Sequence, residues 1–403
     1  MDYWTFTCDC RDRVIKIAMM MYLVVGSGKS GKSAISFLDS LGYPALSYED
    51  GNSEPDLSKI GSVILSPGIP QTHPLIKKAI SLGIEVIGEM ELACRHLKCK
   101  AVGITGTNGK TTTTLMTAHV LNNLGFSAHA LGNVGIPLSS CVAHLTENEI
   151  AVLEFSSFQL ETMSAKVLDA ALILNITPDH LDRYSGIEEY AKAKLKIANC
   201  LKPSAPLFVE QNTFNEFSLL FNHKSLETFS VEGYTVKQIN QAASQALCGQ
   251  FHVSQEQFDM AVRDFNVPMH RLEKVANIDG VDYYNDSKAT NCAATVKAVH
   301  SVPGRIFLIA GGVAKGQHFG HWSQAFGEKV AHIFVIGEAA LQIQEEVKGM
   351  RCTVAGTLSL ALRLARAHAK AGDTILLSPG CASLDQYANY SERGEAFKKM
   401  VKE

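Results

Sequence analysis

The segment Gly103-Ile-Thr-Gly-Thr-Asn-Gly-Lys-Thr111 overlaps the end of an apolar run, Lys100 to Ile104, and leads into a polar helix start. A glycine loop between a strand and a helix turns several backbone N–H groups toward one point, where the helix dipole also favours an anion. Lys110 can reach the β- and γ-phosphates of a nucleoside triphosphate, and Thr111 can hold Mg²⁺. The segment therefore predicts an ATP loop in an α/β fold.

A second glycine loop, Gly26-Ser-Gly-Lys-Ser-Gly-Lys-Ser33, follows the short apolar run Met20 to Val25. This loop satisfies the strict pattern G-x-x-x-x-G-K-[ST], which the first loop fails because Ile104 stands where the pattern needs glycine. It also fits the dinucleotide pattern G-x-G-x-x-G, and Glu49 lies about twenty residues on, where a ribose would need an acid. Three interpretations stay open: an ATP loop, a dinucleotide loop, and a turn that packs a helix on a sheet.

Size and composition are those of an ordinary globular protein of two or three domains: 403 residues, 46% hydrophobic and 19% charged. The formal net charge of -3 gives no electrostatic reason to expect nucleic acid or an anionic membrane as a partner. No apolar stretch reaches the roughly 18 residues of a membrane span. The ten cysteines contain no C-x-x-C pair, which favours a reducing, cytoplasmic setting. We expect small-molecule partners and a monomer.

The first residues resemble a signal peptide, because Arg11 and Arg13 precede the apolar stretch Ile17 to Val25. A first β-strand is the better interpretation, since a glycine turn and an amphipathic segment, Lys32 to Leu41, continue it as a strand, turn and helix. We expect residues 1–18 to be a non-native or disordered extension, with the true start at Met19, Met20 or Met21.

Short apolar runs alternate with helix-length segments along the rest of the chain, which predicts three α/β domains. We expect a Rossmann-like N-terminal domain over 19–97, a central P-loop-type ATPase domain with a mostly parallel sheet over 98–266, and a Rossmann-like C-terminal domain over 267–403. The predicted strands are 20–25, 62–65, 85–87, 100–104, 150–154, 169–176, 305–310, 332–336 and 374–377, and the predicted helices include 187–199 and 254–265.

Two predicted strands of the central domain end in polar side chains. Glu154 ends the strand over 150–154, and Thr177-Pro-Asp-His-Leu-Asp-Arg-Tyr184 follows the strand over 169–176. Open α/β sheets bind ligands at this edge, so Glu154 and His180 are candidate ligands for Mg²⁺ or Mn²⁺. A single strand-end acid is more often only solvated, and the spacing of Lys192, Lys194 and Lys196 fits a solvated basic helix face.

Polar loops also follow three predicted strands of the C-terminal domain: 284–291, 311–316 and 378–386. Their acids, bases and hydroxyls suit the binding of phosphate or carboxylate, although such loops also turn for local reasons.

Six motifs in order resemble the Mur ligases over nearly the whole chain after residue 20. They are Gly103-Ile-Thr-Gly-Thr-Asn-Gly-Lys-Thr-Thr112, Glu154-Phe-Ser-Ser-Phe-Gln-Leu-Glu161, Asp179-His-Leu-Asp-Arg-Tyr184, His270-Arg-Leu-Glu273, Asn285-Asp-Ser-Lys-Ala-Thr-Asn291 and Ser378 to Gln386. The resemblance implies ATP-dependent amide formation in cytoplasmic peptidoglycan synthesis. The third, fifth and sixth of these motifs are most similar to the members that join D-glutamate to UDP-N-acetylmuramoyl-L-alanine through an acyl phosphate.

The resemblance also implies roles for individual residues. Four would be catalytic: Lys110, Glu154, His180 and Lys194. Two Mg²⁺ ions, or Mn²⁺, would be held by Thr111, Glu154, His180 and Lys194, the last carbamylated by CO₂. ATP would contact Gly106, Thr107, Asn108, Gly109, Lys110, Thr111, Thr112, Asn240, Arg271, Asp286 and Lys288. The substrates would contact Ser66, Pro67, Gly68, Asn133, Ser156 and Gln159 on the nucleotide-sugar side, and Thr290, Lys315, Ser383 and Tyr390 on the D-glutamate side.

The chain departs from the family at its adenine motif, where His-Asn-x-x-Asn is replaced by Val236-Lys-Gln-Ile-Asn240. The uracil would rest on the Gly26 to Ser33 loop. Ligands assigned to all three domains imply domain closure. The alternatives are another Mur-type ligase, a folylpolyglutamate-type ligase, a nicotinamide-dependent dehydrogenase, and a nucleotide-gated binding protein.

Overall fold

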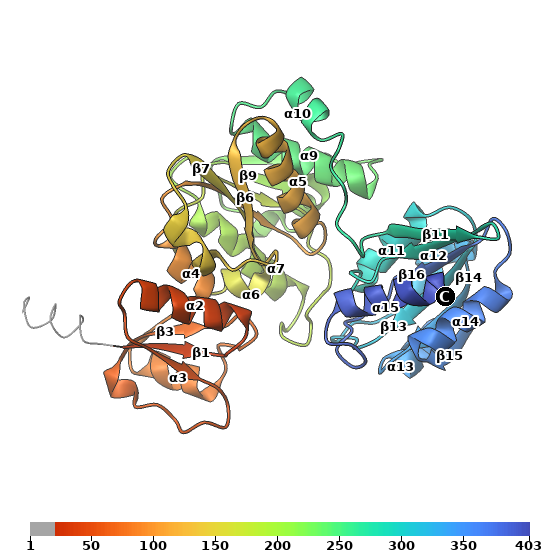
Figure 1. Ribbon diagram of the computed structural model, residues 1–403, viewed down its shortest axis with the longest axis horizontal. Helices are drawn as coiled ribbons and strands as arrows, with labels where there is room; N and C mark the ends of the chain where they lie inside the picture. Colours follow the sequence, from red (N-terminus) through yellow and green to blue (C-terminus); the bar gives the residue numbers. More distant parts are fainter. Residues whose placement is uncertain (1–20) are drawn as a thin grey trace, which may run out of the picture.

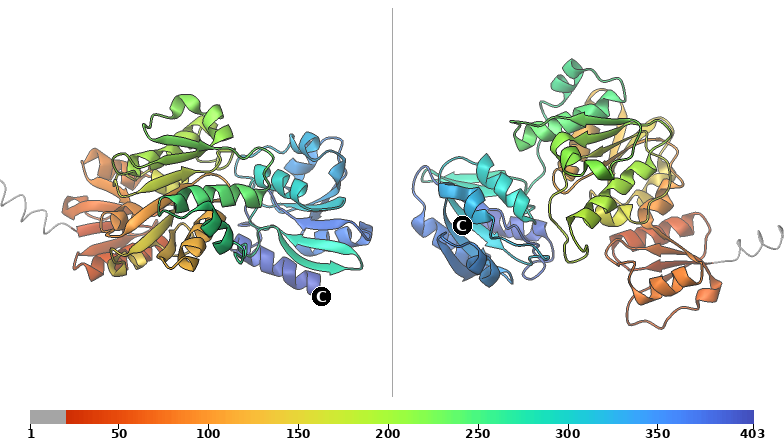
Figure 2. Two further views of the ribbon diagram at one scale, coloured as in Figure 1. Left: turned by 90° about the horizontal axis from the view of Figure 1, so that it is seen from above. Right: turned by 180° about the vertical axis from the view of Figure 1, so that it is seen from behind.

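The computed structural model describes residues 21–403, and the extension expected over 1–18 lies outside the described residues. Three α/β units follow one another along the chain, and the N-terminal and C-terminal units lie on different sides of the central one in both views (Figure 1 and Figure 2). Within this described part, no helix combines the length and apolar character needed to cross a membrane.

The N-terminal unit is a parallel sheet of four strands in the order β2-β1-β3-β4, with helices between the strands. Its first turn is tight, because Gly26 has a φ of 100° and a Cβ on Gly31 would overlap the carbonyl oxygen of Gly26. This close approach supports the interpretation of the first loop as a packing turn. The elements are β1 (Met21–Val25), α2 (Lys29–Ser40), β2 (Ala45–Tyr48), β3 (Ile60–Leu65), α3 (Pro74–Ser81), β4 (Glu85–Gly88) and α4 (Glu89–Cys94).

The central unit is a six-stranded sheet in the order β10-β9-β8-β5-β7-β6, with parallel pairing throughout. The order places β5 and its glycine loop between β7 and β8, so the carboxyl ends of three neighbouring strands meet there. The elements are β5 (Lys100–Thr105), α5 (Lys110–Asn123), β6 (Ser127–Gly132), β7 (Glu149–Glu154), α6 (Ser157–Leu160), β8 (Ala170–Ile173), α7 (Ile187–Leu195), β9 (Leu207–Glu210), α8 (Gln211–Glu216), β10 (Leu226–Phe229), α9 (Val236–Gly249) and α10 (Gln255–Ala261).

The C-terminal unit is a six-stranded sheet in the order β11-β12-β16-β13-β14-β15, parallel except for the antiparallel pair β11 and β12. The predicted α/β class with parallel sheets is therefore confirmed. The elements are β11 (Glu273–Ile278), β12 (Val281–Asn285), α11 (Cys292–Ser301), β13 (Ile306–Gly311), α12 (Trp322–Phe326), β14 (Val330–Ile336), α13 (Ala340–Glu346), β15 (Cys352–Gly356), α14 (Leu358–His368), β16 (Thr374–Leu377) and α15 (Tyr390–Lys402).

Three predicted elements are shorter than expected. The strand over 169–176 ends at Ile173, because the following Asn175 bonds the glycine loop: its carbonyl oxygen accepts from Thr107 N at 2.6 Å and its Oδ1 from Asn108 N at 2.9 Å. The helix over 187–199 ends at Leu195 and continues as a 3₁₀ turn, Lys196–Cys200. The helix over 254–265 covers only Gln255–Ala261, with Ser254 as its N-cap.

The N-terminal and central units share one hydrophobic core. Val24, Leu38 and Ile64 of the first unit belong to the same buried cluster as Leu131 and Leu153 of the second. The buried side chains of the C-terminal unit form separate clusters. The junction near residue 98 is therefore packed, whereas the one near residue 267 is not enclosed in a common core.

Glu91 on α4 joins the N-terminal unit to the central unit through hydrogen bonds. Its side chain is 1% exposed and accepts hydrogen bonds from Ser164 N at 2.8 Å, Ala165 N at 2.9 Å and Arg95 Nε at 2.9 Å. These partners hold the pKa of the Glu91 carboxyl below its usual range against the opposing effect of burial. The carboxylate therefore stays charged and bonded at the junction.

We expect Glu91→Ala to lower the free energy of unfolding by roughly 3 kcal/mol, because it removes a buried carboxylate that two backbone N–H groups, the Ser164 hydroxyl and Arg95 all use as an acceptor. Glu85→Ala is the matched control, since Glu85 also pairs with Arg95 but its side chain is 48% exposed, and its loss should cost less than about 1 kcal/mol. Urea unfolding followed by circular dichroism measures both. Equal losses for the two variants would contradict the role given to Glu91.

Candidate active site

The loop between β5 and α5 has the geometry of a phosphate-binding loop. Gly109 is the N-cap of α5 with a φ of 90°, and a Cβ there would lie 2.7 Å from Asn240 Oδ1. The Lys110 ammonium folds back over the loop and donates to the carbonyl oxygen of Thr107 at 2.8 Å. Burial lowers the pKa of Lys110, while the carboxylates of Glu154 and Asp179 oppose that shift. The Lys110 side chain therefore lies beside a helix N-terminus, where it can bind an anion.

A cavity of about 440 Å³ opens beside this loop and is lined by all three units. Thr111, Glu154, His180 and Lys194 all line it, so the structure brings the four predicted metal ligands to one place. Pro67 contributes from the N-terminal unit. Three C-terminal loops contribute Thr290, Lys315 and Ser383, and the start of α15 contributes Tyr390.

Glu154 ends β7 and its side chain is 1% exposed. Its Oε1 accepts a hydrogen bond from Asn133 Nδ2 at 2.8 Å, while its buried Oε2 has no hydrogen-bond partner among the described residues. A buried carboxylate oxygen without a partner is costly unless a ligand completes it. The oxygen chemistry fits Mg²⁺, which prefers carboxylate and hydroxyl oxygens, and Thr111 supplies a hydroxyl to the same cavity.

His180 is held in a left-handed backbone conformation with a φ of 56°. Its backbone N–H donates to Asp179 Oδ1 at 2.9 Å, and its ring centroid lies 4.8 Å from that of Phe158. Burial is the main cause that lowers the pKa of His180 to about 4. The imidazole is therefore neutral near pH 7, the form that binds a metal ion.

Lys194 is buried, with 1% of the residue exposed. Its Nζ donates to the carbonyl oxygen of Gly106 at 2.8 Å and lies 4.4 Å from the Tyr190 ring centroid. Burial, followed by the nearby Lys110 ammonium, holds the pKa of Lys194 well below its ordinary value. A lowered pKa increases the neutral fraction of the amine, which is the form that reacts with CO₂.

The prediction of a solvated basic face is therefore wrong for Lys194. It holds for Lys192, an exposed side chain whose ammonium pairs with Glu188 at 2.6 Å. A signal was present in the sequence: Lys194 lies four residues after Tyr190 and three before Ile197, which places it on the apolar side of the helix.

Within the described residues, no three His, Cys, Asp or Glu side chains gather as a metal site. A metal ion in this cavity would therefore depend on Glu154 and His180 together with ligands of other kinds, such as the Thr111 hydroxyl and the phosphates of a nucleotide.

Polar contacts join the central and C-terminal units across this cavity. Lys315 Nζ donates to Asp179 Oδ1 at 2.6 Å, and Asn291 Nδ2 donates to Asp179 Oδ2 at 3.2 Å and to Asn108 Oδ1 at 3.1 Å. Lys315 has a φ of 53°, another left-handed conformation at a strand-end loop. The lysine predicted to hold a substrate carboxylate thus already pairs with a protein carboxylate at the domain boundary.

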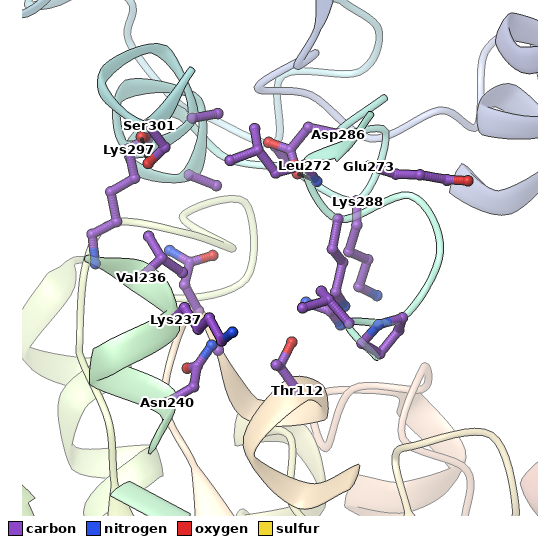
Figure 3. Close-up of a pocket in the computed structure, with 18 of the residues that line it drawn as sticks. Thr112, Val236, Lys237, Asn240, Leu272, Glu273, Asp286, Lys288, Lys297 and Ser301 are labelled. Carbon is purple, nitrogen blue, oxygen red and sulfur yellow. Dashed lines mark hydrogen bonds between the residues drawn. The ribbon is translucent and has the colours of Figure 1, made fainter. Parts of the chain in front are cut away.

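A second cavity of about 360 Å³ (Figure 3) adjoins the first, since Asn108, Gly109, Arg271 and Lys288 line both. Thr112 and Asn240 reach it from the central unit, and Asp286 and Lys288 from the C-terminal unit. Burial raises the pKa of Asp286 to about 7 and lowers that of Lys288 to about 7. The lining also contains the predicted Asn108, Gly109 and Arg271, together with Val236 and Lys237 from the altered adenine motif. It adds Met116 and Lys297, which the sequence did not single out.

The remaining predicted residues form two groups. Asn133 and Ser156 line the larger cavity, whereas Ser66 and Gln159 line a small neighbouring pocket. Ser156 and Gln159 also form the capping box of α6, a structural role that their sequence spacing indicates. The residues Gly106 and Thr107 belong to the glycine loop itself, and Thr107 Oγ1 donates to the carbonyl oxygen of Thr177 at 3.1 Å.

Family models match two parts of the chain: "Mur ligase middle domain" over residues 104–274 and "Mur ligase, glutamate ligase domain" over residues 270–381. The UDP-N-acetylmuramoylalanine--D-glutamate ligase of Protochlamydia amoebophila is 41% identical, over 94% of this chain and 97% of that protein. The protein of the same name from Chlamydia pneumoniae is 35% identical over 94% and 98%.

Solved structures share the fold at low sequence identity. The MurF ligase of Thermotoga maritima in complex with ADP gives a TM-score of 0.61 at 16% identity, covering 96% of this chain and 99% of that one. The UDP-N-acetylmuramate-alanine ligase MurC of the same organism gives 0.59 at 17%, covering 95% and 99%.

Proposed function

The chain belongs to the Mur ligase family, and from this membership we propose that it joins D-glutamate to UDP-N-acetylmuramoyl-L-alanine in peptidoglycan synthesis, using ATP. Two partners follow from the names of its relatives: the UDP-linked acid and D-glutamate. The structural observation that carries the proposal is the buried, unpartnered Oε2 of Glu154 in the cavity that Lys110 and Thr111 also line.

The reaction needs an activated acid, because a carboxylate and an ammonium ion form a salt at neutral pH rather than an amide. The substrate carboxylate attacks the γ-phosphorus of ATP, ADP leaves, and an acyl phosphate remains. The free amine of D-glutamate then attacks the acyl carbon, the nitrogen releases a proton, and phosphate leaves from the tetrahedral intermediate to give the amide. Positioning and charge neutralisation supply most of the catalysis in phosphoryl transfer.

Lys110 and the N–H groups at the start of α5 bind the β- and γ-phosphates in this proposal, as the loop geometry supports. Glu154, Thr111 and His180 would hold Mg²⁺, or Mn²⁺, which would neutralise phosphate charge when bound. The base and ribose occupy the second cavity between Asn240, Arg271 and Asp286. Asn240 is the part of the adenine motif that this chain retains.

The carbamate on Lys194 is part of the same proposal. Its support is the buried amine with a lowered pKa in the cavity that contains the other candidate ligands. Carbamylation converts this amine into an anionic oxygen ligand. It would add a further anionic oxygen group to the cavity that the Glu154 carboxylate also lines.

D-glutamate lies against the C-terminal loops, where Lys315, Thr290, Ser383 and Tyr390 line the larger cavity. The UDP-linked substrate enters past the loop Ser66-Pro-Gly68, with its uracil end toward the Gly26 to Ser33 loop. We propose the three domains with boundaries near 98 and 267, a monomer, and a cytoplasmic location where both substrates are soluble.

The dehydrogenase alternative leaves Lys110, Glu154 and His180 without a function. A folylpolyglutamate-type or other Mur-type ligase would use the same central unit, so substrate choice decides between them.

Phosphate release from ATP should require both UDP-N-acetylmuramoyl-L-alanine and D-glutamate. L-Lysine and meso-diaminopimelate should each give less than roughly 1% of that rate. L-Lysine lacks the second carboxylate and leaves its polar partners unpaired, and meso-diaminopimelate carries its second carboxylate further away and adds an ammonium group. A malachite-green phosphate assay with each amino acid in turn measures this, and omission of the UDP-linked acid gives the background. Equal rates with L-lysine would identify a different ligase.

A further inference from the structure

Arg183 belongs to the motif Asp179-His-Leu-Asp-Arg-Tyr184 but has no role in the function described so far. Its side chain is 16% exposed and has three partners. Nη1 donates to the carbonyl oxygen of Pro67 at 3.0 Å, Nη2 donates to Glu161 Oε2 at 2.7 Å, and the guanidinium carbon lies 4.0 Å from the Phe158 ring centroid. One side chain thus bonds two units of the molecule.

Each partner leads to a different part of the site. Pro67 lies in the loop proposed for the UDP-linked substrate and lines the larger cavity. Phe158 packs edge-on against the ring of His180 at 4.8 Å. Glu161 is fixed independently, because Tyr184 donates to its Oε1 at 2.6 Å. Arg183 therefore connects a substrate loop of the N-terminal unit to the side of the cavity that carries His180.

The three contacts depend on the shape of the guanidinium group. It is planar, presents donors in a fixed fork, and stacks on aromatic rings, which an ammonium group cannot do at the same time. The carbonyl of Pro67 gains a charged donor whose direction is set by the ion pair with Glu161. The guanidinium group, fixed in direction by Glu161, therefore holds the Pro67 loop in place.

We propose that Arg183 is a positioning residue that holds the Ser66-Pro-Gly68 loop at the cavity, so that the UDP-linked acid is presented at a fixed place. This role rests on the proposed function. Arg183 acts through the Pro67 carbonyl, and its effect falls on binding of the UDP-linked substrate rather than on ATP.

Arg183→Met should raise the KM for UDP-N-acetylmuramoyl-L-alanine by roughly tenfold or more, the effect of losing a charged hydrogen bond, and leave the KM for ATP within about twofold. Arg183→Lys should give an intermediate KM, because lysine can donate to Pro67 or to Glu161 but loses the stacked fork.

Arg95→Met is the matched control. Arg95 also lies at the junction of the first two units and forms two ion pairs, with Glu85 at 2.8 Å and Glu91 at 2.9 Å. Neither partner lines the larger cavity. This variant should lose stability and keep both KM values, so it separates a structural effect from a positioning one.

Calorimetric titration of the same UDP-linked acid into each variant gives the comparison without turnover. A loss of affinity in Arg183→Met that Arg95→Met does not show would support the proposal. Unchanged affinity and KM in Arg183→Met, or equal rises in the KM for both substrates, would overturn it. The proposed function is tested on the wild-type protein alone, by whether phosphate release depends on D-glutamate. The role of Arg183 and the proposed function can therefore fail separately.

Discussion

Lys110→Met should lower kcat by roughly a thousandfold, the upper range for removing one charged donor from a preorganised transition-state site. The Lys110 ammonium is the cation that extends over the glycine loop, and its contact with the Thr107 carbonyl shows that it reaches across the turn. Methionine keeps the length and apolar volume of the stem but removes the charge that stabilises the transferring phosphoryl group. Phosphate release at saturating substrates measures the change.

Lys100→Met is the control for this experiment. Lys100 begins β5, is exposed, and its ammonium lies 5.9 Å from the Phe251 ring centroid, away from both cavities. Its replacement should leave kcat within about twofold, as surface changes usually do. A kcat for Lys110→Met within tenfold of the wild type would argue against the central loop as the site of ATP.

Lys194→Ala should lower activity by roughly a hundredfold or more, because it deletes both the buried amine and the carbamate formed on it. Short carboxylic acids or bicarbonate should restore part of the activity by entering the space left behind and supplying an oxygen ligand. Phosphate release with and without added formate or acetate gives the measurement.

The control here is Lys192→Ala on the same helix, which removes an exposed lysine paired with Glu188 and should change nothing measurable. Carbon-13 NMR of wild-type protein in labelled bicarbonate provides a second measurement, with a carbamate signal that is absent in Lys194→Ala. Loss of activity without rescue, together with no carbamate signal in the wild type, would contradict the carbamate.

The sequence predicted the parts of the site that depend on local structure. A glycine loop after an apolar run places Lys110 and Thr111 at a helix start, and an acid that ends a buried strand places Glu154 at the sheet edge. Each inference requires only that one strand be recognised and that its carboxyl end be located in the sequence. The positions of β5, β7 and β8 in the sheet then bring these residues together.

Burial and long-range contacts could not be predicted in the same way. Lys194 is buried because α7 packs against the central sheet, and its surroundings come from residues far away in the chain, such as Gly106. Lys237 and Lys297 meet at the second cavity only because two units approach each other there. The contact of Arg183 with Pro67 spans 116 residues and has no local signature.

Because the first two units share a core, we expect any opening of the molecule to occur at one joint, near His270 and Leu272, which are both left-handed with φ of 63° and 49°. A compound that contacts only the loop at Pro67 and the end of β7 should bind equally well whether the C-terminal unit is in an open or a closed position. One that also reaches Lys315 should select the shut form and trap it. Inhibitors of the second kind should therefore dissociate slowly, at a rate set by the opening of this joint rather than by their own contacts.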